Sequence, residues 1–148
     1  MGAETATEKK MNKKIRVCVI GAGTAGLSAV KNSLDHHLEV VCYERNENVG
    51  GTWIYENTDI TIQTDEEVHS SMYQGLRTNL PKEVMGFPDF PYPDKFHLSF
   101  VTSEEVLEYL NMYADHFKLK NHIQFQHEVL RVKPRLNRDW EASTTSVC

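Results

Sequence analysis

A glycine turn between an apolar run and a helical pattern constrains this chain more than any other feature. Residues 15–20 read IRVCVI, a short β-branched run typical of a strand covered on both faces in a parallel sheet, and we expect it to be the central strand. A G-x-G-x-x-G pattern follows, and apolar residues at helical spacing then predict a helix that ends near His36. A second apolar run, residues 38–43, leads directly into Glu44. Strand, turn, helix and strand within about thirty residues predict one βαβ unit.

The glycines of this turn have separate mechanical roles. Gly21 permits the tight turn out of the strand, Gly23 lets backbone amides approach a pyrophosphate, and Gly26 lets the helix pack on the sheet. The helix N-terminus then favours an anion, and the Glu44 carboxylate can accept hydrogen bonds from ribose hydroxyls. We therefore assign the whole turn to dinucleotide binding, together with the acid: Gly21, Ala22, Gly23, Thr24, Ala25, Gly26 and Glu44.

The residues around the acid bear on which dinucleotide binds. Glu44 disfavours the 2′-phosphate of NADP and Arg45 partly offsets this, so the pair favours FAD or NAD without deciding between them. A double glycine, Gly50 and Gly51, lets the chain pass close to a ligand. The indole of Trp53 either covers the flavin end of that ligand or packs in the core. The order of these motifs favours FAD over NAD, and an NAD-dependent dehydrogenase is the weaker alternative.

Regular patterning stops and then returns along the rest of the chain. Residues 46–99 contain four of the five prolines and no sustained periodicity, which indicates a long irregular excursion that wraps a ligand, or a pair of short helices. Thr102 and Glu105 form a capping box before a strongly periodic helix. Residues 123–125 can then add a third parallel strand through a right-handed crossover.

The end of the chain is expected to lack regular structure. Residues 129–132 and the region of Trp140 resemble the start of a hairpin that is not completed. Residues 141–148, EASTTSVC, show no strand pattern, so we expect an unpatterned tail there. We expect residues 1–14 to be a disordered polar leader, because they contain no apolar segment that could act as a signal or anchor.

Composition excludes several function classes. The net charge of −5 provides no basic field for nucleic acid, and no apolar stretch is long enough to span a bilayer. Cys18 and Cys42 lie inside apolar runs, which favours reduced thiols and a cytoplasmic setting. The seven histidines are scattered without metal-site spacing, so we expect no metal.

The motif order resembles the flavin-containing monooxygenases over about residues 14–140. G-x-G-x-x-G, the acid and G-G-x-W are followed by residues 71–73 (SMY), 76–85 (LRTNLPKEVM) and 89–91 (DFP), which are similar to the signature of that family. The resemblance implies flavin contacts at Thr52 and Trp53. It also implies that Asn79 is the catalytic residue, that Thr78 and Asn79 contact the nicotinamide cofactor, and that Asn79 and Leu80 contact the flavin.

The resemblance also implies a fold and an activity. The expected fold is a partial doubly wound, Rossmann-like α/β FAD-binding domain over residues 15–140. The expected activity is NADPH-dependent oxygenation, with dioxygen, of a small amine or sulfide that is a soft nitrogen or sulfur nucleophile. A Baeyer-Villiger oxygenase is a related alternative that the Leu-Arg-Thr-Asn and Asp-Phe-Pro segments disfavour, and a non-catalytic FAD-binding fragment or isoform is another.

The sequence departs from the family pattern in its second glycine motif. None of the eight glycines follows Gly86, so the NADPH-binding glycine motif of the family is absent from these residues. We therefore expect a truncated chain that is inactive alone, with an open sheet edge that can self-associate. Association with the endoplasmic reticulum is expected only through a C-terminal part that these residues do not contain.

Overall fold

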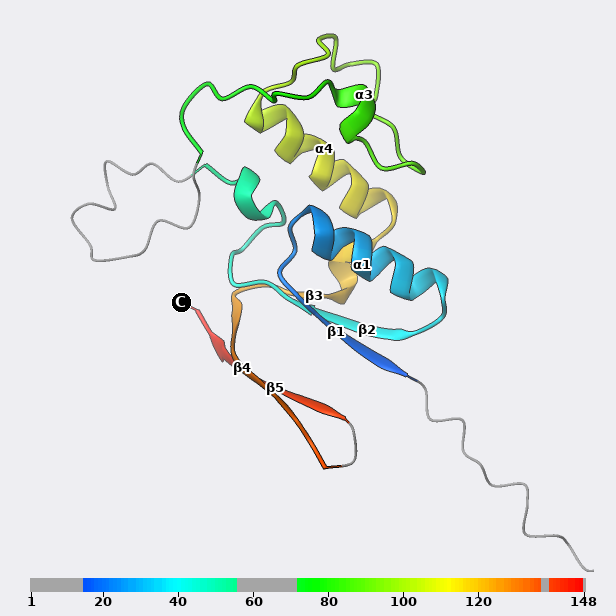
Figure 1. Ribbon diagram of the computed structural model, residues 1–148, viewed down its shortest axis with the longest axis vertical. Helices are drawn as coiled ribbons and strands as arrows, with labels where there is room; N and C mark the ends of the chain where they lie inside the picture. The colour runs from blue at the N-terminus through cyan, green and yellow to red at the C-terminus, as the bar shows by residue number, and fades with distance from the viewer. Residues whose placement is uncertain (1–14, 56–71, 137–138, 148) are drawn as a thin grey trace, which may run out of the picture.

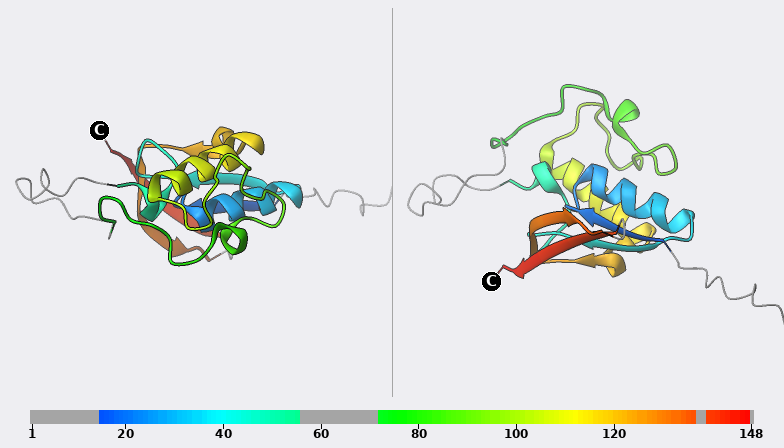
Figure 2. Two further views of the ribbon diagram at one scale, coloured as in Figure 1. Left: turned by 90° about the horizontal axis from the view of Figure 1, so that it is seen from above. Right: turned by 60° about the horizontal axis from the view of Figure 1, so that its bottom comes forward.

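The fold consists of a parallel sheet covered by helices on one side and by a β-hairpin on the other. The computed structural model describes residues 15–55, 72–136 and 139–147, so the predicted polar leader lies outside the described residues. Figure 1 and Figure 2 show α1 and α4 together on one side of the parallel sheet and the β4–β5 hairpin on the opposite side. The parallel sheet has the order β1-β2-β3, with the bounds β1 Arg16–Ile20, β2 Glu39–Tyr43 and β3 Ile123–Gln124.

The first strand lies at an edge of this sheet, and the expectation of a central, doubly covered strand is wrong for the described residues. β1 pairs in parallel with β2 along its whole length, and β2 is the middle strand. Val17 and Val19 pack toward the core, while Arg16, Cys18 and Ile20 are exposed on the other face. An apolar run predicts a strand, but the position of that strand in the sheet depends on distant partners that the run does not encode.

The remaining elements of the βαβ unit form as predicted. Helix α1 spans Thr24–Asp35, and His36 is its C-cap. Leu27 and Val30 lie on its buried face against the sheet. Strand β3 joins β2 in parallel, which confirms the third strand, although it is only two residues long. The sequence signals were strong here because the glycine turn and the helical spacing are local features.

Helix α4 spans Ser103–His116 and provides Tyr109 and Tyr113, the two most deeply buried aromatic residues of the core. The predicted capping box is present: the Glu105 amide donates to Thr102 Oγ1 at 3.3 Å, and the Thr102 amide donates to Glu105 Oε2 at 2.8 Å. These bonds satisfy two amides of the first turn that would otherwise lack partners. Its buried face carries Val106, Tyr109, Leu110, Tyr113 and Ala114.

The excursion between β2 and α4 is largely irregular in its described part. It contains two short helical turns, η1 (Gly51–Trp53) and α3 (Lys82–Met85). The two predicted alternatives, an irregular excursion and a pair of short helices, therefore each describe part of this segment, since the short helices occur within an otherwise irregular path. Figure 1 shows the segment from residue 72 to α4 on the side of α4 that is farther from the sheet. A further turn, η2 (Leu119–His122), leads from α4 into β3.

The hairpin is complete, which corrects the expectation of an unfinished hairpin and an unpatterned tail. β4 (His127–Pro134) pairs antiparallel with β5 (Trp140–Ser146). Residues 143–146 are exposed throughout, so they lack the alternation of apolar and polar residues that would have indicated a strand. Pairing with β4 supplies the strand conformation that the local pattern did not predict.

Candidate cofactor site

The glycine turn at the N-terminus of α1 is held tightly against β2. Gly21 has φ +88°, in the region that favours glycine, and its amide donates to the Tyr43 carbonyl at 2.8 Å. A Cβ on Gly26 would lie 1.8 Å from the Gly21 carbonyl oxygen. Helix α1 therefore reaches the sheet only because residue 26 is a glycine, as predicted.

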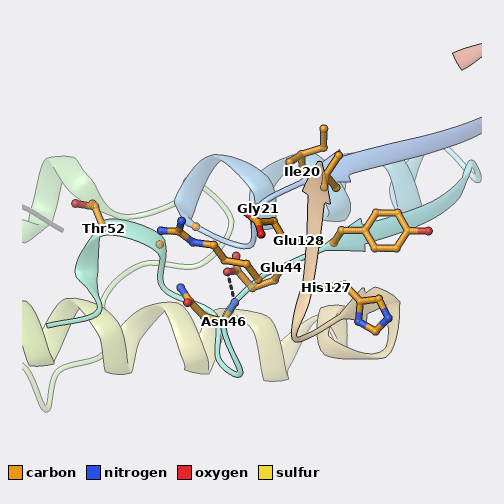
Figure 3. Close-up of a pocket in the computed structure, with 12 residues that line it drawn as sticks. Ile20, Gly21, Glu44, Asn46, Thr52, His127 and Glu128 are labelled. Atoms are coloured by element: carbon orange, nitrogen blue, oxygen red, sulfur yellow. Dashed lines mark hydrogen bonds between the residues drawn. The ribbon is translucent and has the colours of Figure 1, made fainter. Parts of the chain in front are cut away.

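The Glu44 carboxylate lies across the start of this turn and is 4% exposed. Its Oε2 accepts a hydrogen bond from the Ala22 amide at 2.6 Å. Its Oε1 accepts one from the Asn46 amide at 2.9 Å, which Figure 3 shows as a dashed line. The Glu44 amide donates to the Gln124 carbonyl, and the His127 amide donates to the Glu44 carbonyl, both at 2.9 Å. Each carboxylate oxygen keeps a second lone-pair site, so this fixed acid can still accept hydrogen bonds from a ligand.

The double glycine packs directly on the first glycine turn. The Gly50 amide donates to the Ala22 carbonyl at 3.1 Å. Gly51 has φ +56°, and a Cβ there would lie 2.9 Å from the Gly23 Cα. A Cβ on Gly50 would lie 2.4 Å from Leu107 Cδ1 on α4. The two glycine motifs therefore form one structure, in which Gly26, Gly50 and Gly51 leave no room for a Cβ.

A cavity of about 370 Å³ opens at the carboxyl ends of β1 and β2, beside this structure. Ligands of open α/β sheets bind at such ends. Predicted residues provide half of its lining: Gly21, Gly23, Glu44, Arg45, Gly51 and Thr52. The other lining residues were not predicted: Ile20, Tyr43, Asn46, His127, Glu128 and Val129.

The start of β4 is the part of this lining that sequence reasoning missed most clearly. Residues 127–129 reach the cavity because the chain after β3 continues alongside the residues that follow β2. The Gln126 amide donates to the Asn46 carbonyl at 3.1 Å, and the His127 amide donates to the Glu44 backbone carbonyl. His127 also has its Nδ1 at 2.7 Å from the Phe125 carbonyl oxygen. The only available signal was the prediction of a third parallel strand over residues 123–125, which did not say which strand it would pair with.

Several predicted residues lie beside the cavity without lining it. Ala22 is fully buried, and its backbone contacts both Glu44 and Gly50. Trp53 is partly buried and packs against the core, which favours core packing between its two predicted roles. Thr24, Ala25, Gly26 and Gly50 belong to the turn and the double glycine but are outside the lining.

The Thr78–Leu80 segment is not brought to this cavity. Thr78 is 6% exposed, and its amide donates to the Val101 carbonyl at 2.9 Å. Its Oγ1 is buried and has no hydrogen-bond partner among the described residues. Asn79 and Leu80 are exposed on the excursion. The structure thus places the predicted catalytic residue apart from the residues that line the glycine-turn cavity.

The two cysteines that the structure describes occupy different environments. Cys42 on β2 is fully buried, and its Sγ donates to the Gly21 carbonyl at 3.5 Å. Burial raises the pKa of the Cys42 thiol to about 12, so it stays a neutral donor beneath the turn. Cys18 is exposed on the outer face of β1, so only Cys42 behaves as the predicted buried apolar residue.

Two further classes of site were searched within the described residues. Residues 15–55, 72–136 and 139–147 contain no group of three or more histidine, cysteine or acidic side chains that could hold a metal ion. In the same residues, no helix has the length and apolar character needed to cross a membrane.

Fold and site together define a dinucleotide-binding α/β unit. The chain matches the model of the family described as flavin-binding monooxygenase-like over residues 13–146, and it belongs to that family. The resemblance deduced from the sequence motifs is thereby confirmed.

Curated relatives and solved structures agree with this assignment. The chain is 40% identical over 133 residues to flavin-containing monooxygenase 5 of Oryctolagus cuniculus, covering 87% of this chain and 24% of the relative. It is 40% identical over 141 residues to flavin-containing monooxygenase FMO GS-OX-like 1 of Arabidopsis thaliana, covering 88% and 30%. The structure of S-allyl-L-cysteine S-oxygenase from Allium sativum matches with a TM-score of 0.80 and 36% identity, covering 88% of this chain and 32% of that one. The chain therefore spans about a quarter to a third of the length of these relatives.

Proposed function

We propose that this chain binds FAD and contributes the FAD-binding part of an NADPH-dependent monooxygenase acting on soft nitrogen or sulfur nucleophiles. The observation that carries the proposal is the packing of Gly51 on Gly23 beside the buried Glu44, because Gly21, Gly23 and Gly51 then present backbone without side chains to the cavity and form a backbone cradle. Such a cradle at a helix N-terminus suits a pyrophosphate, and an acid at the end of the second strand suits a ribose.

The donors and acceptors of the cavity fit the adenosine and pyrophosphate portions of FAD. Gly21 and Gly23 offer close backbone approach, and no acidic residue lies in the first turn of α1 to repel phosphate. Glu44 would receive the ribose hydroxyls, and Arg45 adds a cation at the rim. His127 and Val129, on the far side of Glu44, would border the adenine base. The cavity volume lies within the range of ordinary small-molecule sites.

The flavin end of the ligand is proposed to extend past the double glycine toward the excursion. The buried Thr78 hydroxyl, which has no partner within the described part of the chain, supports this, since a buried polar atom usually has a partner and a ligand can supply one. Asn79 and Leu80 would then contact the flavin, and Thr78 and Asn79 would contact the nicotinamide cofactor. Thr52 would also contact the flavin, and Trp53, which packs against the core, would contact it only through the part of its side chain that is still exposed. When bound, FAD supplies the redox chemistry, and these residues bind, orient and exclude water.

Overall, one atom of dioxygen would enter the substrate as an N-oxide or S-oxide and the other would leave as water, with NADPH supplying two electrons. A non-catalytic FAD-binding role is the second candidate, because these 148 residues contain a single G-x-G-x-x-G motif with which to hold a dinucleotide. The reduced thiols favour a cytoplasmic setting. The unpaired outer edge of β1 in the described sheet favours self-association.

Analysis of the products formed by the protein purified from its natural source tests this proposal. The protein is supplied with FAD, NADPH and dioxygen, and with S-allyl-L-cysteine, a tertiary amine or cyclohexanone in separate reactions. NADPH-dependent S-oxide or N-oxide is the expected product. A lactone from cyclohexanone alone would favour the Baeyer-Villiger alternative, and no NADPH-dependent product from any of the three would favour the non-catalytic role.

A further inference from the structure

The Asp89-Phe90-Pro91 motif has no part in the cavity, yet it joins three elements of the fold. Lys31 on α1 lies 2.5 Å from the Asp89 carboxylate and 2.7 Å from that of Asp35, one turn along its own helix. The same ammonium lies 5.1 Å from the centre of the Phe117 ring at the end of α4. Lys31 therefore contacts α1, the 87–92 turn and α4 at once.

Aromatic contacts fix the same turn to α4. The Tyr109 hydroxyl donates to the Phe90 carbonyl at 2.5 Å and accepts from the Phe87 amide at 2.7 Å. The Phe87 ring stacks on Tyr113 at 3.9 Å, and the Tyr92 ring stacks on Tyr109 at 3.7 Å. These contacts tie the turn only to α4, so within the 87–92 turn the Lys31–Asp89 pair supplies the ionic link to α1.

The turn directly follows α3, and the Gly86 amide at the end of α3 donates to the Lys82 carbonyl at 3.1 Å. The Lys82 amide donates to the Ser99 carbonyl at 2.7 Å, and the Thr78 amide donates to the Val101 carbonyl. A shift of the 87–92 turn relative to α1 would therefore act through α3 on Lys82, and on the two bonds that hold residues 78–82 to residues 99–101. Helix α1 begins at the glycine turn, so the ion pair links the helix that starts at one end of the proposed FAD site to the excursion that carries Asn79.

We infer that Lys31 and Asp89 form a latch that holds the excursion in register with α1, so that Asp89 is a positioning residue for the flavin end of the site. This inference rests on the proposed function, because the position matters only if FAD extends from the glycine turn to Asn79. The pairing also lowers the pKa of Asp89 and raises that of Lys31, so both stay charged across the neutral range.

The chain offers a matched control for this latch. Lys95, also on the excursion, pairs with Glu108 of α4 at 2.6 Å and lies 5.0 Å from the centre of the Phe96 ring. It has the same chemistry as Lys31 but does not reach α1. Lys95→Met should therefore leave the register of the excursion on α1 unchanged.

The test uses four variants of the full 148-residue chain. Three are the single substitutions Asp89→Asn, Lys31→Met and Lys95→Met. The fourth is the reversed pair, a double variant that carries both Lys31→Asp and Asp89→Lys. Without ligand, the rate of amide hydrogen exchange at Thr78 and Lys82 should rise about two- to fivefold in Asp89→Asn and in Lys31→Met. This is the range that the free energy of a partly exposed ion pair supports. The exchange rate should stay at the wild-type level in Lys95→Met, and it should return toward the wild-type level in the reversed pair. Unchanged exchange in Asp89→Asn, or an equal rise in Lys95→Met, would overturn the latch.

A ligand arm tests the positioning role. With ADP as the probe, the dissociation constants of all four variants should match the wild type, because ADP occupies only the glycine-turn end. With FAD, Asp89→Asn and Lys31→Met should leave the bound flavin more accessible to iodide quenching of its fluorescence, and the reversed pair should restore protection. Equal quenching in wild type and Asp89→Asn would overturn the positioning role. A wild type that binds neither ADP nor FAD would refute the proposed function, and the exchange arm would still decide whether the latch exists.

Discussion

Gly51 and Gly23 lie in backbone contact, so that a Cβ on Gly51 would come within 2.9 Å of the Gly23 Cα. The contact joins two motifs separated by a helix and a strand in the sequence. It also determines where a ligand can pass, because the cavity is lined by both glycines. The glycines of the second motif are therefore needed for the shape of the first.

Gly51→Ala should weaken FAD binding while Gly75→Ala should not. Both positions have positive φ, +56° and +76°, so both variants should lose stability from backbone strain, on the order of 1 kcal/mol. Only at Gly51 does the new Cβ meet backbone, since nothing lies within 4 Å of a Cβ at Gly75. We expect a rise of about tenfold or more in the FAD dissociation constant for Gly51→Ala, measured by flavin titration. Equal affinities for the two variants would mean that the contact does not shape the site.

Replacing Glu44 should destabilise the protein even without ligand. In Glu44→Gln, one side-chain oxygen becomes an NH₂ group that faces the Ala22 or Asn46 amide, so one buried hydrogen bond is lost. The free energy of unfolding should fall by about 1–3 kcal/mol. Glu44→Ala should also weaken FAD binding, by roughly 1.5–3 kcal/mol, because a charged acceptor is lost. Glu128→Gln, at an exposed acid lining the same cavity, is the control for urea denaturation and should behave as wild type.

Stability should fall at alkaline pH, and Cys42 should account for the first part of the fall. Its pKa is about 12 in the folded chain, whereas an unfolded thiol ionises near its ordinary value of 9.0. Between these values the unfolded state binds fewer protons, so the free energy of unfolding decreases as pH rises through this window and is unaffected below it. Burial also raises the pKa of Tyr92 and Tyr113 to about 12, which extends the fall above their ordinary value of 10.0. Denaturation at about pH 8 and about pH 10 should show a smaller decrease in Cys42→Ala than in wild type. An equal decrease in both would exclude Cys42 as its origin.

Residues 1–148 with saturating FAD should oxidise NADPH no faster than free FAD, with or without a thioether. A hydride donor must be held within roughly 3–3.5 Å of its acceptor, and these residues contain a single G-x-G-x-x-G motif with which to hold a dinucleotide. The measurement is the loss of NADPH absorbance together with S-oxide analysis. Substrate-dependent turnover above the free-flavin rate would show that this segment builds a nicotinamide site of its own.

The sequence predicted the features that local residues encode. The glycine turn, α1, Glu44 at the end of β2 and the capping box of α4 each follow from spacing within a few residues, and each is present. The edge position of β1 and the lining by residues 127–129 depend on which distant segments pair, which no local pattern reports. Strand β5 was missed because its exposed threonines and serines form a strand only through pairing with β4.

The relation between the two halves of the site was also beyond the sequence. The motif order suggested that Asn79 belongs with the glycine turn, but in the described structure it is exposed and outside the cavity lining. The ion pair of Lys31 with Asp89 had no local signal, because its partners lie on a helix and on a turn far along the chain. Both relations follow from packing of the excursion on α1 and α4.

The central claim is that residues 15–147 build the adenosine and pyrophosphate end of an FAD site, and competition between ADP and FAD tests it most directly. FAD is titrated into residues 1–148 by fluorescence, and the titration is repeated with ADP present. We expect saturable binding of one FAD per chain that ADP displaces, with the affinity for both ligands reduced in Gly51→Ala and unchanged in Gly75→Ala. FAD binding that ADP does not displace, or no saturable binding of either ligand, would contradict it.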